Sequence, residues 1–263
     1  MGSASREALA AAKSTLAAAG GVSLATGEQL LAAGRAIESS GQLRSVLADP
    51  SVEADRKAAL LKSIFGSLDA TASRVLTGAV SSRWSTPGEL VAGIEELGIR
   101  AIAISAGPDA GIENELFAFG GTVSTDHDLE LAVGSKLGAP EAKAALVDAL
   151  LAGKVQPATL VIVRHLVQSP RGRRIGQLLS GAADIVADAQ GAIVATVTSA
   201  VRPAPAQVTA LEKALATRYG RSLRINLIID PTIVGGLRVQ VGDDVIDGTV
   251  ASRLADLRIR LAG

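Results

Sequence analysis

Apolar positions along the first 190 residues recur with the period of an α-helix. Between glycine and proline breaks, leucine, isoleucine, valine and alanine fall three or four positions apart, as the buried stripe of a helix requires. This pattern predicts helices over residues 4–19, from Thr26, over 43–47, from Ser51 to Phe65, over 70–83 and from Pro87 to Ser105. The first 105 residues are therefore expected to form a helical bundle.

The same pattern then returns 86 positions later. Leu30 corresponds to Leu116 at this offset, and the four residues 57–60 correspond to 143–146 without a gap. Two extra residues near 170–173 move the offset to 88. Chance similarity between alanine-rich helices is the alternative, but agreement in order over about five helices favours a duplicated bundle. The repeat is also longer than the units of common solenoids.

After Gln190 the apolar period changes from helical to alternating. Ile193, Ala195 and Val197 predict a strand, and Pro205 suits the first turn of a following helix. Two more alternating stretches, 223–229 and 237–241, predict strands, and the stripe Val250, Leu254, Leu257 and Leu261 predicts a final helix. The sequence thus predicts a mainly α fold, with a duplicated N-terminal helical bundle and a small α/β C-terminal domain. The expected domains are a first helical copy at 1–105, a second at 106–190 and the α/β domain at 191–263.

Composition narrows the possible functions. Apolar residues make up 48% of the chain and aromatic residues 2%, and the formal net charge is zero. A nucleic-acid partner is not expected, because phosphate binding needs an excess of basic residues and base stacking needs aromatic ones. The absence of cysteine excludes disulfides, cysteine-ligated zinc and a cysteine nucleophile. No apolar run approaches the ~18–20 residues of a membrane span, so direct membrane insertion is not expected.

The acidic and glycine-rich turns near the C-terminus have ordinary structural explanations. Asp243, Asp244 and Asp247 lack the spacing of a calcium-binding loop, so we interpret them as turn and helix-cap residues. Gly235 and Gly236 belong to no phosphate-binding motif, so backbone geometry is their expected role. We therefore predict no metal site and no cofactor site.

The remaining polar residues form no catalytic constellation. His127 and His165 have no acidic partner near them in sequence, so both are interpreted as structural or solvated. The basic run 171–174 is expected to be a solvated loop or a salt-bridging contact with a partner. No nucleophile-elbow motif occurs. We predict no catalytic residues.

Residues 229–250 carry a long ordered motif with four two-residue steps. These steps give the structural signature residues Asp230, Pro231, Gly235, Gly236, Gly242, Asp243, Asp247 and Gly248. The segment resembles the C-terminal signature of the ATP synthase delta subunit family, whose mitochondrial relative is the oligomycin sensitivity conferral protein. Residues 43–66 and 160–174 resemble the middle helices of the same family.

The resemblance implies a non-catalytic peripheral-stalk subunit of an F-type ATP synthase. The helical domain would grip the N-terminal segment of an alpha subunit, and the C-terminal domain would hold the C-terminal helices of the b subunits. The catalytic head would then resist rotor torque during proton-driven ATP synthesis. The implied location is the cytoplasmic face of the plasma membrane, as a peripheral subunit. A typical member has one helical domain, so the extra copy leaves open which copy meets alpha.

Apolar stripes on the helices are the candidates for partner contacts, although plain core packing is the alternative for each residue. The candidates are Leu16, Leu30, Leu76, Val80, Leu116, Ile162, Leu166, Val250, Leu254 and Leu257. Two other classes of protein compete with the stalk subunit. A helical adaptor unrelated to ATP synthase would keep the repeat but treat the 229–250 signature as coincidence, and an enzyme would need an active site that the sequence does not offer.

Overall fold

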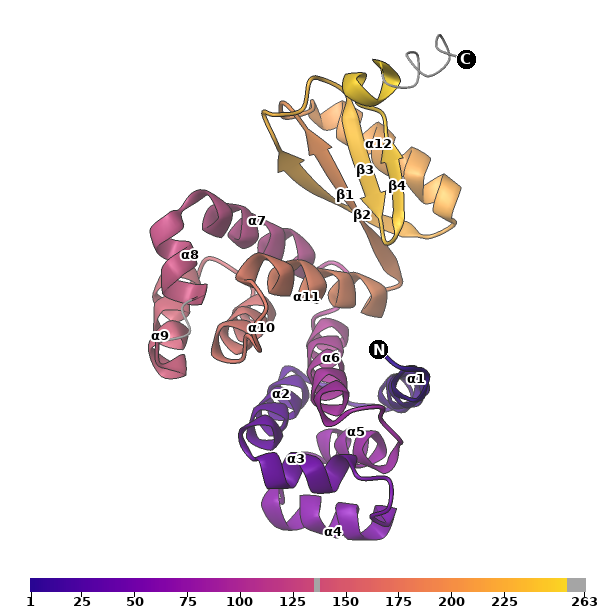
Figure 1. Cartoon of the computed structure of the whole chain (residues 1–263), viewed down its shortest axis with the longest axis vertical. Helices are drawn as coiled ribbons and strands as arrows, with labels where there is room; N and C mark the ends of the chain where they lie inside the picture. Colours follow the sequence, from indigo (N-terminus) through magenta and orange to yellow (C-terminus); the bar gives the residue numbers. More distant parts are fainter. Residues whose placement is uncertain (135–137, 255–263) are drawn as a thin grey trace.

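The computed structural model describes residues 1–134 and 138–254, and within them eleven helices precede a small four-stranded sheet (Figure 1). The predicted mainly α fold, with its duplicated bundle and α/β C-terminal domain, is confirmed. The helices before the sheet are α1 Ser3–Ala17, α2 Leu24–Ser39, α3 Gly41–Ala48, α4 Ala54–Ile64, α5 Ala70–Ser81, α6 Pro87–Ala106, α7 Ile112–Thr125, α8 His127–Gly134, α9 Pro140–Leu151, α10 Pro157–Gln168 and α11 Ile175–Ala189.

Helix boundaries in the first bundle follow from local capping chemistry. The Thr86 side chain accepts a hydrogen bond from the Glu89 backbone N–H, and Pro87 occupies the first helical position of α6. Gly107 follows α6 with a φ of 80°, a left-handed conformation that favours glycine. Asp69 caps α5 in the same way as Thr86 caps α6. These polar caps explain why the periodic stripe starts and stops where the sequence predicted.

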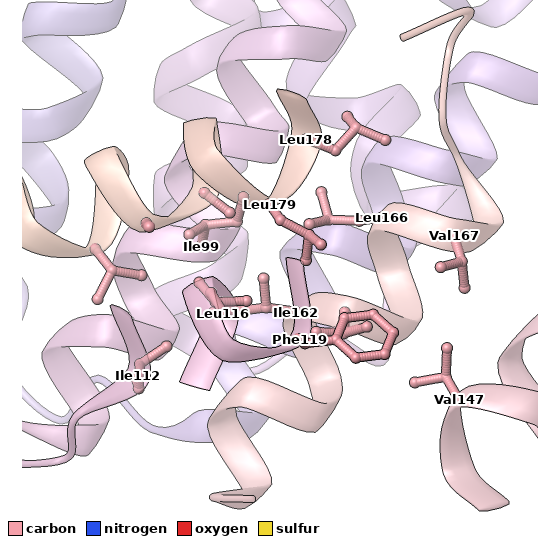
Figure 2. Close-up of a cluster of buried hydrophobic side chains, with 14 of the residues drawn as sticks. Ile99, Ile112, Leu116, Phe119, Val147, Ile162, Leu166, Val167, Leu178 and Leu179 are labelled. Carbon is pink, nitrogen blue, oxygen red and sulfur yellow. The ribbon is translucent and has the colours of Figure 1, made fainter. Parts of the chain in front are cut away.

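Two aliphatic cores hold the helical part together, and α6 contributes to both. Leu90, Ile94 and Leu97 lie in the first core with residues of α1 to α5. Ile99 and Ile102 lie in the second core with residues of α7 to α11. Figure 2 shows the second core, where Ile99 meets side chains from the later helices. α6 is therefore buried on two sides, which accounts for its high content of buried apolar residues.

The repeat is visible in the order of the helices. α2 to α6 recur as α7 to α11, and equivalent apolar positions are buried in both copies. Leu30 and Leu116 are both fully buried, and so are Leu76 and Ile162. Even the lysine of the gapless segment is buried in both copies, as Lys57 and Lys143. The domain boundaries at 105 and 190 remain predictions.

The C-terminal unit is a mixed sheet with one helix on one face. Its elements are β1 Ala192–Ser199, α12 Pro205–Tyr219, β2 Ser222–Ile229, β3 Leu237–Val241 and β4 Asp244–Asp247. The strand order is β2-β1-β3-β4, with β1 parallel to β2 and antiparallel to β3. Apolar residues of one sheet face pack with Leu211 and Leu215 of α12 in a third core. The sequence missed β4, because only Val245 and Ile246 are apolar in that strand and aspartates flank them.

The sheet follows directly from α11 and contacts the second copy. Ala192 and Val194 of β1 pack with Ala187 of α11 and Phe117 of α7. The Arg224 side chain donates a hydrogen bond to the Pro108 carbonyl, in the connection between α6 and α7. None of the helices in the described parts of the chain is both long and apolar enough to cross a bilayer.

Candidate partner-binding site

The signature motif folds into a tight junction at one end of the sheet. The Val250 N–H donates to the Gly235 carbonyl at 3.2 Å, and the Gly248 N–H donates to the Leu237 carbonyl at 2.9 Å. Gly236 has a φ of 84°, and a Cβ at this position would lie 2.5 Å from the Gly248 carbonyl oxygen. Only glycine fits here, because both the conformation and the close backbone approach exclude a side chain.

Aspartates of the signature stabilise the turns on either side of this junction. The Thr232 N–H and hydroxyl both donate to Asp230 Oδ1, at 2.9 and 2.6 Å. Hydrogen bonds from Thr232 lower the pKa of Asp230, and those from Thr249 lower the pKa of Asp247. The Thr249 hydroxyl accepts from the Ser252 N–H at 3.2 Å, as a helix N-cap does. Asp243 thus lies in the predicted turn and Thr249 caps the following helix, whereas Asp244 and Asp247, predicted as turn and cap residues, are the first and last residues of β4.

Exposed apolar side chains surround the same end of the sheet. Val201 is 72% exposed, Val234 70%, Leu254 60% and Val250 42%. A cavity of about 260 Å³ opens beside them between α12 and the sheet, lined by residues that include Val201 and Gly236. Exposed apolar side chains gathered in one region are typical of protein-binding surfaces. We call Val201, Val234, Val250 and Leu254 the sheet-end patch; Leu257, the third candidate on this helix, lies outside the described residues.

The other seven candidate contacts lie inside the helical cores. Each is at most 1% exposed: Leu16, Leu30, Leu76, Val80, Leu116, Ile162 and Leu166. A partner would reach them only by opening a bundle. Leu16 of α1 and Leu76 and Val80 of α5 instead lie in the first core, beneath the contact between these two helices.

The outer surface where α1 meets α5 is open to solvent and carries small side chains. Ala11 is exposed and Thr15 is half-buried on α1, and Gly78 of α5 faces Thr15. A Cβ at Gly78 would lie 3.9 Å from the Thr15 hydroxyl, so the two helices are close at this point. We call this surface the α1–α5 seam.

The equivalent seam of the second copy is covered. Shifting α1 by 86 residues places it on α6, so that Ala11 and Thr15 correspond to Leu97 and Ala101. Both of these α6 residues are fully buried in the first core. α2 also lies beside α10, where Arg35 Nη1 donates to His165 Nδ1 at 2.7 Å. In the second copy, α2 therefore covers the surface that corresponds to the α1–α5 seam.

His165 and the basic run 171–174, for which the sequence indicated no partner, contact the same carboxylate in the structure. His165 is buried, and its Nε2 lies 3.1 Å from a Glu95 carboxylate oxygen. Arg171 and Arg173 of the basic run form ion pairs with the same carboxylate. The basic run is therefore a salt-bridging loop whose partner is the other copy of the same chain. No sequence signal reveals these pairs, because the residues lie about 70 positions or more apart.

Acidic and histidine side chains are dispersed over the part of the chain that the structure describes. Within 1–134 and 138–254, no three histidine, cysteine, aspartate or glutamate side chains are grouped to hold a metal ion. The buried Glu95 carboxylate is paired with His165 and Arg171, which come from the second copy. Stacked helical bundles, an open seam and an exposed apolar patch are features typical of proteins that bind other proteins.

The family match and two relatives identify the same family. The ATP synthase delta (OSCP) subunit family matches residues 100–261, more than half of the chain. The chain is 50% identical to ATP synthase subunit delta of Leifsonia xyli subsp. xyli, over the full length of both. It is 39% identical to ATP synthase subunit delta of Streptomyces avermitilis, over 98% of each chain. A chain of the Toxoplasma gondii mitochondrial ATP synthase hexamer matches with a TM-score of 0.42 and 18% identity, over 64% of this chain and 95% of that one.

The chain belongs to the ATP synthase delta (OSCP) subunit family. The family match starts inside α6 and covers the second copy and the sheet. The full-length matches show that these relatives also carry the region equivalent to the first copy. An adaptor unrelated to ATP synthase, the alternative that the sequence left open, is therefore wrong.

Proposed function

We propose that this chain is a non-catalytic peripheral-stalk subunit of an F-type ATP synthase. It ties the alpha/beta catalytic head to the b-subunit stalk, so that the head resists rotor torque during proton-driven ATP synthesis. Membership of the delta family carries this proposal, because the relatives are named as subunits of ATP synthase. The proposed location is the cytoplasmic face of the plasma membrane, through the complex.

A tether needs two separate attachment surfaces, and the chain has two candidates at opposite ends. The first bundle lies at one end of the molecule in Figure 1 and the sheet at the other, with the second copy between them. The α1–α5 seam belongs to the first bundle, and the sheet-end patch lies beyond the strands. Two moderate contacts joined in one molecule dissociate slowly as a pair, because each keeps the other at high effective concentration.

The first copy is the better candidate for the alpha subunit. Its α1–α5 seam is open, whereas the equivalent α6–α10 seam is covered by α2. Small side chains such as Ala11 and Gly78 let a partner helix approach the backbone closely. We therefore propose that the N-terminal segment of alpha lies along α1 and α5, with Leu16, Leu76 and Val80 holding the two helices together beneath it.

The sheet-end patch is the candidate for the C-terminal helices of the b subunits. Val250 and Leu254 stand on the helical turn that the Gly235–Gly236 junction orients. An amphipathic helix from b would cover these side chains with its own apolar stripe. The eight signature residues would act indirectly, by fixing the position of this turn.

Binding of the full-length chain to the purified alpha subunit and to a C-terminal b fragment tests both contacts. Gly78→Arg should lose alpha and keep b, because the new side chain fills the seam. Leu254→Glu should lose b and keep alpha, because it places a charge in the patch. Ser63→Arg, on the exposed face of α4, should change neither affinity.

The outcomes separate a wrong surface from a wrong function. Retention of alpha by Gly78→Arg would show that the seam is not the site. Failure of the unmodified chain to bind either subunit would overturn the stalk proposal.

Gly236→Val is a harsher variant, which should unfold the sheet end while the helical circular dichroism signal remains. Normal b binding by that variant would contradict the role of the junction.

A further inference from the structure

α6 occupies the same place in the second copy that α1 occupies in the first. α6 shifted back by 86 residues covers positions 1–20, and α1 spans Ser3–Ala17. Leu16 corresponds to Ile102, and each is fully buried in the core of its own copy. α1 leads into α2 as α6 leads into α7. α6 is therefore both the last helix of the first copy and the first helix of the second.

A buried ionic cluster joins the copies on one side of α6. Glu95 of α6 is paired with Arg171 and Arg173 from the loop before α11 and with His165 of α10. On α2, the Glu38 carboxylate accepts a hydrogen bond from the Ser169 hydroxyl at 2.5 Å and lies 3.9 Å from Arg171. The cluster thus contains groups from α2, α6, α10 and the loop, which belong to both copies.

Hydrogen-bond directions assign a neutral state to His165. Arg35 is a donor only, so His165 Nδ1 must accept its hydrogen bond, and Nε2 then carries the proton donated to Glu95. Burial, together with Arg35 and Arg171, lowers the pKa of His165 despite the opposing influence of Glu95. The ring therefore links Arg35 of the first bundle to the shared helix without a charge of its own.

The loop that reaches into this cluster is the place where the two copies differ in length. The two residues that shift the offset from 86 to 88 lie in the connection between α10 and α11. Arg171 has a φ of 46° and Gly172 a φ of 74° in that connection. A non-glycine residue in the left-handed region is unfavourable and persists where surrounding contacts hold it. Here the ion pairs of Arg171 with Glu38 and Glu95 supply those contacts.

A second ionic chain runs along the other side of α6 and reaches the sheet. Lys13 of α1 pairs with Glu96 at 2.6 Å, and Glu96 pairs with Arg100 at 3.0 Å. Arg100 also pairs with Asp188 of α11 at 2.5 Å, and Asp188 pairs with Arg221, just before β2, at 3.2 Å. Five charges of alternating sign therefore connect the first bundle, the shared helix, the second bundle and the sheet unit.

We infer that the two helical copies and the sheet form one rigid strut, in which α6 is a shared helix fixed between two ionic clusters. Freely hinged domains are normally joined by an exposed linker with few contacts across it. Here the connection between the copies is a continuous helix that is buried on both sides. The added copy then acts as a stiff spacer between the two ends of the chain. This stiffness is a property of the chain alone and requires no ATP synthase partner.

Distances between pairs of spin labels on the full-length chain test the strut directly. The chain has no cysteine, so cysteines introduced at exposed positions are the only labelling sites. Ser63 on α4, Glu130 on α8 and Lys213 on α12 are exposed and report on the first copy, the second copy and the sheet. The unmodified strut should give one narrow distance distribution for the 63/130 pair and one for the 130/213 pair.

Substitutions in the Glu95 cluster and in the ionic chain from Lys13 to Arg221 should broaden the distance distributions of different label pairs. Glu95→Ala and the milder Arg171→Ala should broaden the 63/130 distribution, and Arg221→Ala should broaden only the 130/213 distribution. Glu53→Ala, which removes an exposed ion pair with Arg56 on the first copy, should broaden neither. Broad distributions in the unmodified chain would overturn the rigid strut, and so would unchanged narrow ones in Arg171→Ala protein with unaltered circular dichroism.

Discussion

The two helical copies have the same core but different outer faces, and the outer faces determine where each copy packs. On the first copy, Arg35, Glu38 and Glu95 are charged, and α10 and its following loop cover them. The equivalents of Arg35 and Glu38 in the second copy are Gly121 and Ser124, which are exposed, whereas the equivalent of Glu95 is Ala183, which is buried in the second core. Core positions stay apolar because any change there leaves a cavity or an overpacked site. Outer positions are free to change, so duplication could give the copies different neighbours.

The helix crossings also differ between the copies. α2 crosses α6 at Gly27 and Gly98, where a Cβ on Gly27 would lie 2.3 Å from Ile102 and one on Gly98 2.6 Å from Leu31. The equivalent residues of the second copy, where α7 packs on α11, are Glu113 and Val186. The first copy thus needs a closer approach of backbones, which fits the double burial of α6.

Gly27→Val should have the largest effect of the substitutions that probe this comparison. The new side chain would collide with Ile102 and with the Gly98 carbonyl, which are part of a continuous helix and cannot move independently. Overpacking of this kind typically costs ~1–3 kcal/mol, and a clash with backbone lies at the upper end. Urea denaturation of the full-length chain would show the loss as a lower midpoint.

The matched control for this substitution lies in the second copy. Gly121 is also a helical glycine, but no atom outside its own helix backbone lies within 4 Å of a Cβ built there. Gly121→Val should therefore leave the midpoint nearly unchanged. Equal losses for the two valines would mean that Gly27→Val acts through a general effect of valine in a helix and not through the close contact of α2 with α6.

Acid should weaken the first copy's outer contacts through His165 and Glu95. The lowered pKa of buried His165 means that the unfolded chain takes up a proton first, so stability falls as the pH drops below the ordinary value of 6.5. Burial raises the pKa of Glu95, but His165, Arg171 and Arg173 outweigh it and lower the pKa to about 2. Stability from Glu95 is complete above pH 4.5 and is lost between pH 4.5 and 2.

His165→Gln separates these two pH ranges. A glutamine can accept from Arg35 and donate to Glu95 but does not titrate, so the fall below pH 6.5 should disappear while the fall below pH 4.5 remains. Thermal melts at pH 7.5, 6.0, 5.0 and 4.0 measure both. His127→Gln, at an exposed position on α8, serves as the control. A decline below pH 6.5 that persists in His165→Gln would mean that another group causes it.

The sequence predicted the helices and the repeat because their signals are local. Stripes three or four residues apart, and caps such as Thr86 and Asp69, depend on neighbours along the chain. The same local logic identified the glycine junction at the sheet end. It failed for β4, where the strand has too few apolar residues to show an alternation.

Contacts between the copies were beyond sequence reasoning for a physical reason. Glu95 interrupts the apolar residues of α6. No residue near it in sequence indicates that His165 and Arg171 pair with it. A single division at residue 105 likewise assigns α6 to one copy, because a periodic stripe does not reveal that a helix is buried on a second face. Which seam is open depends on the packing of the copies and therefore appears only in three dimensions.

Substitution by alanine at two equivalent positions gives the most direct comparison of the copies. Arg35→Ala should destabilise the chain by about 1–3 kcal/mol, because it leaves the buried His165 Nδ1 without its donor. Gly121→Ala should stabilise it by roughly 0.4–1 kcal/mol, because alanine reduces the entropy of the unfolded chain and meets no neighbour. Both are measured by urea denaturation at pH 7.5, where His165 is neutral. Changes of the same sign would show that the outer faces of α2 and α7 still have the same environment, and the two copies would then differ in sequence without differing in role.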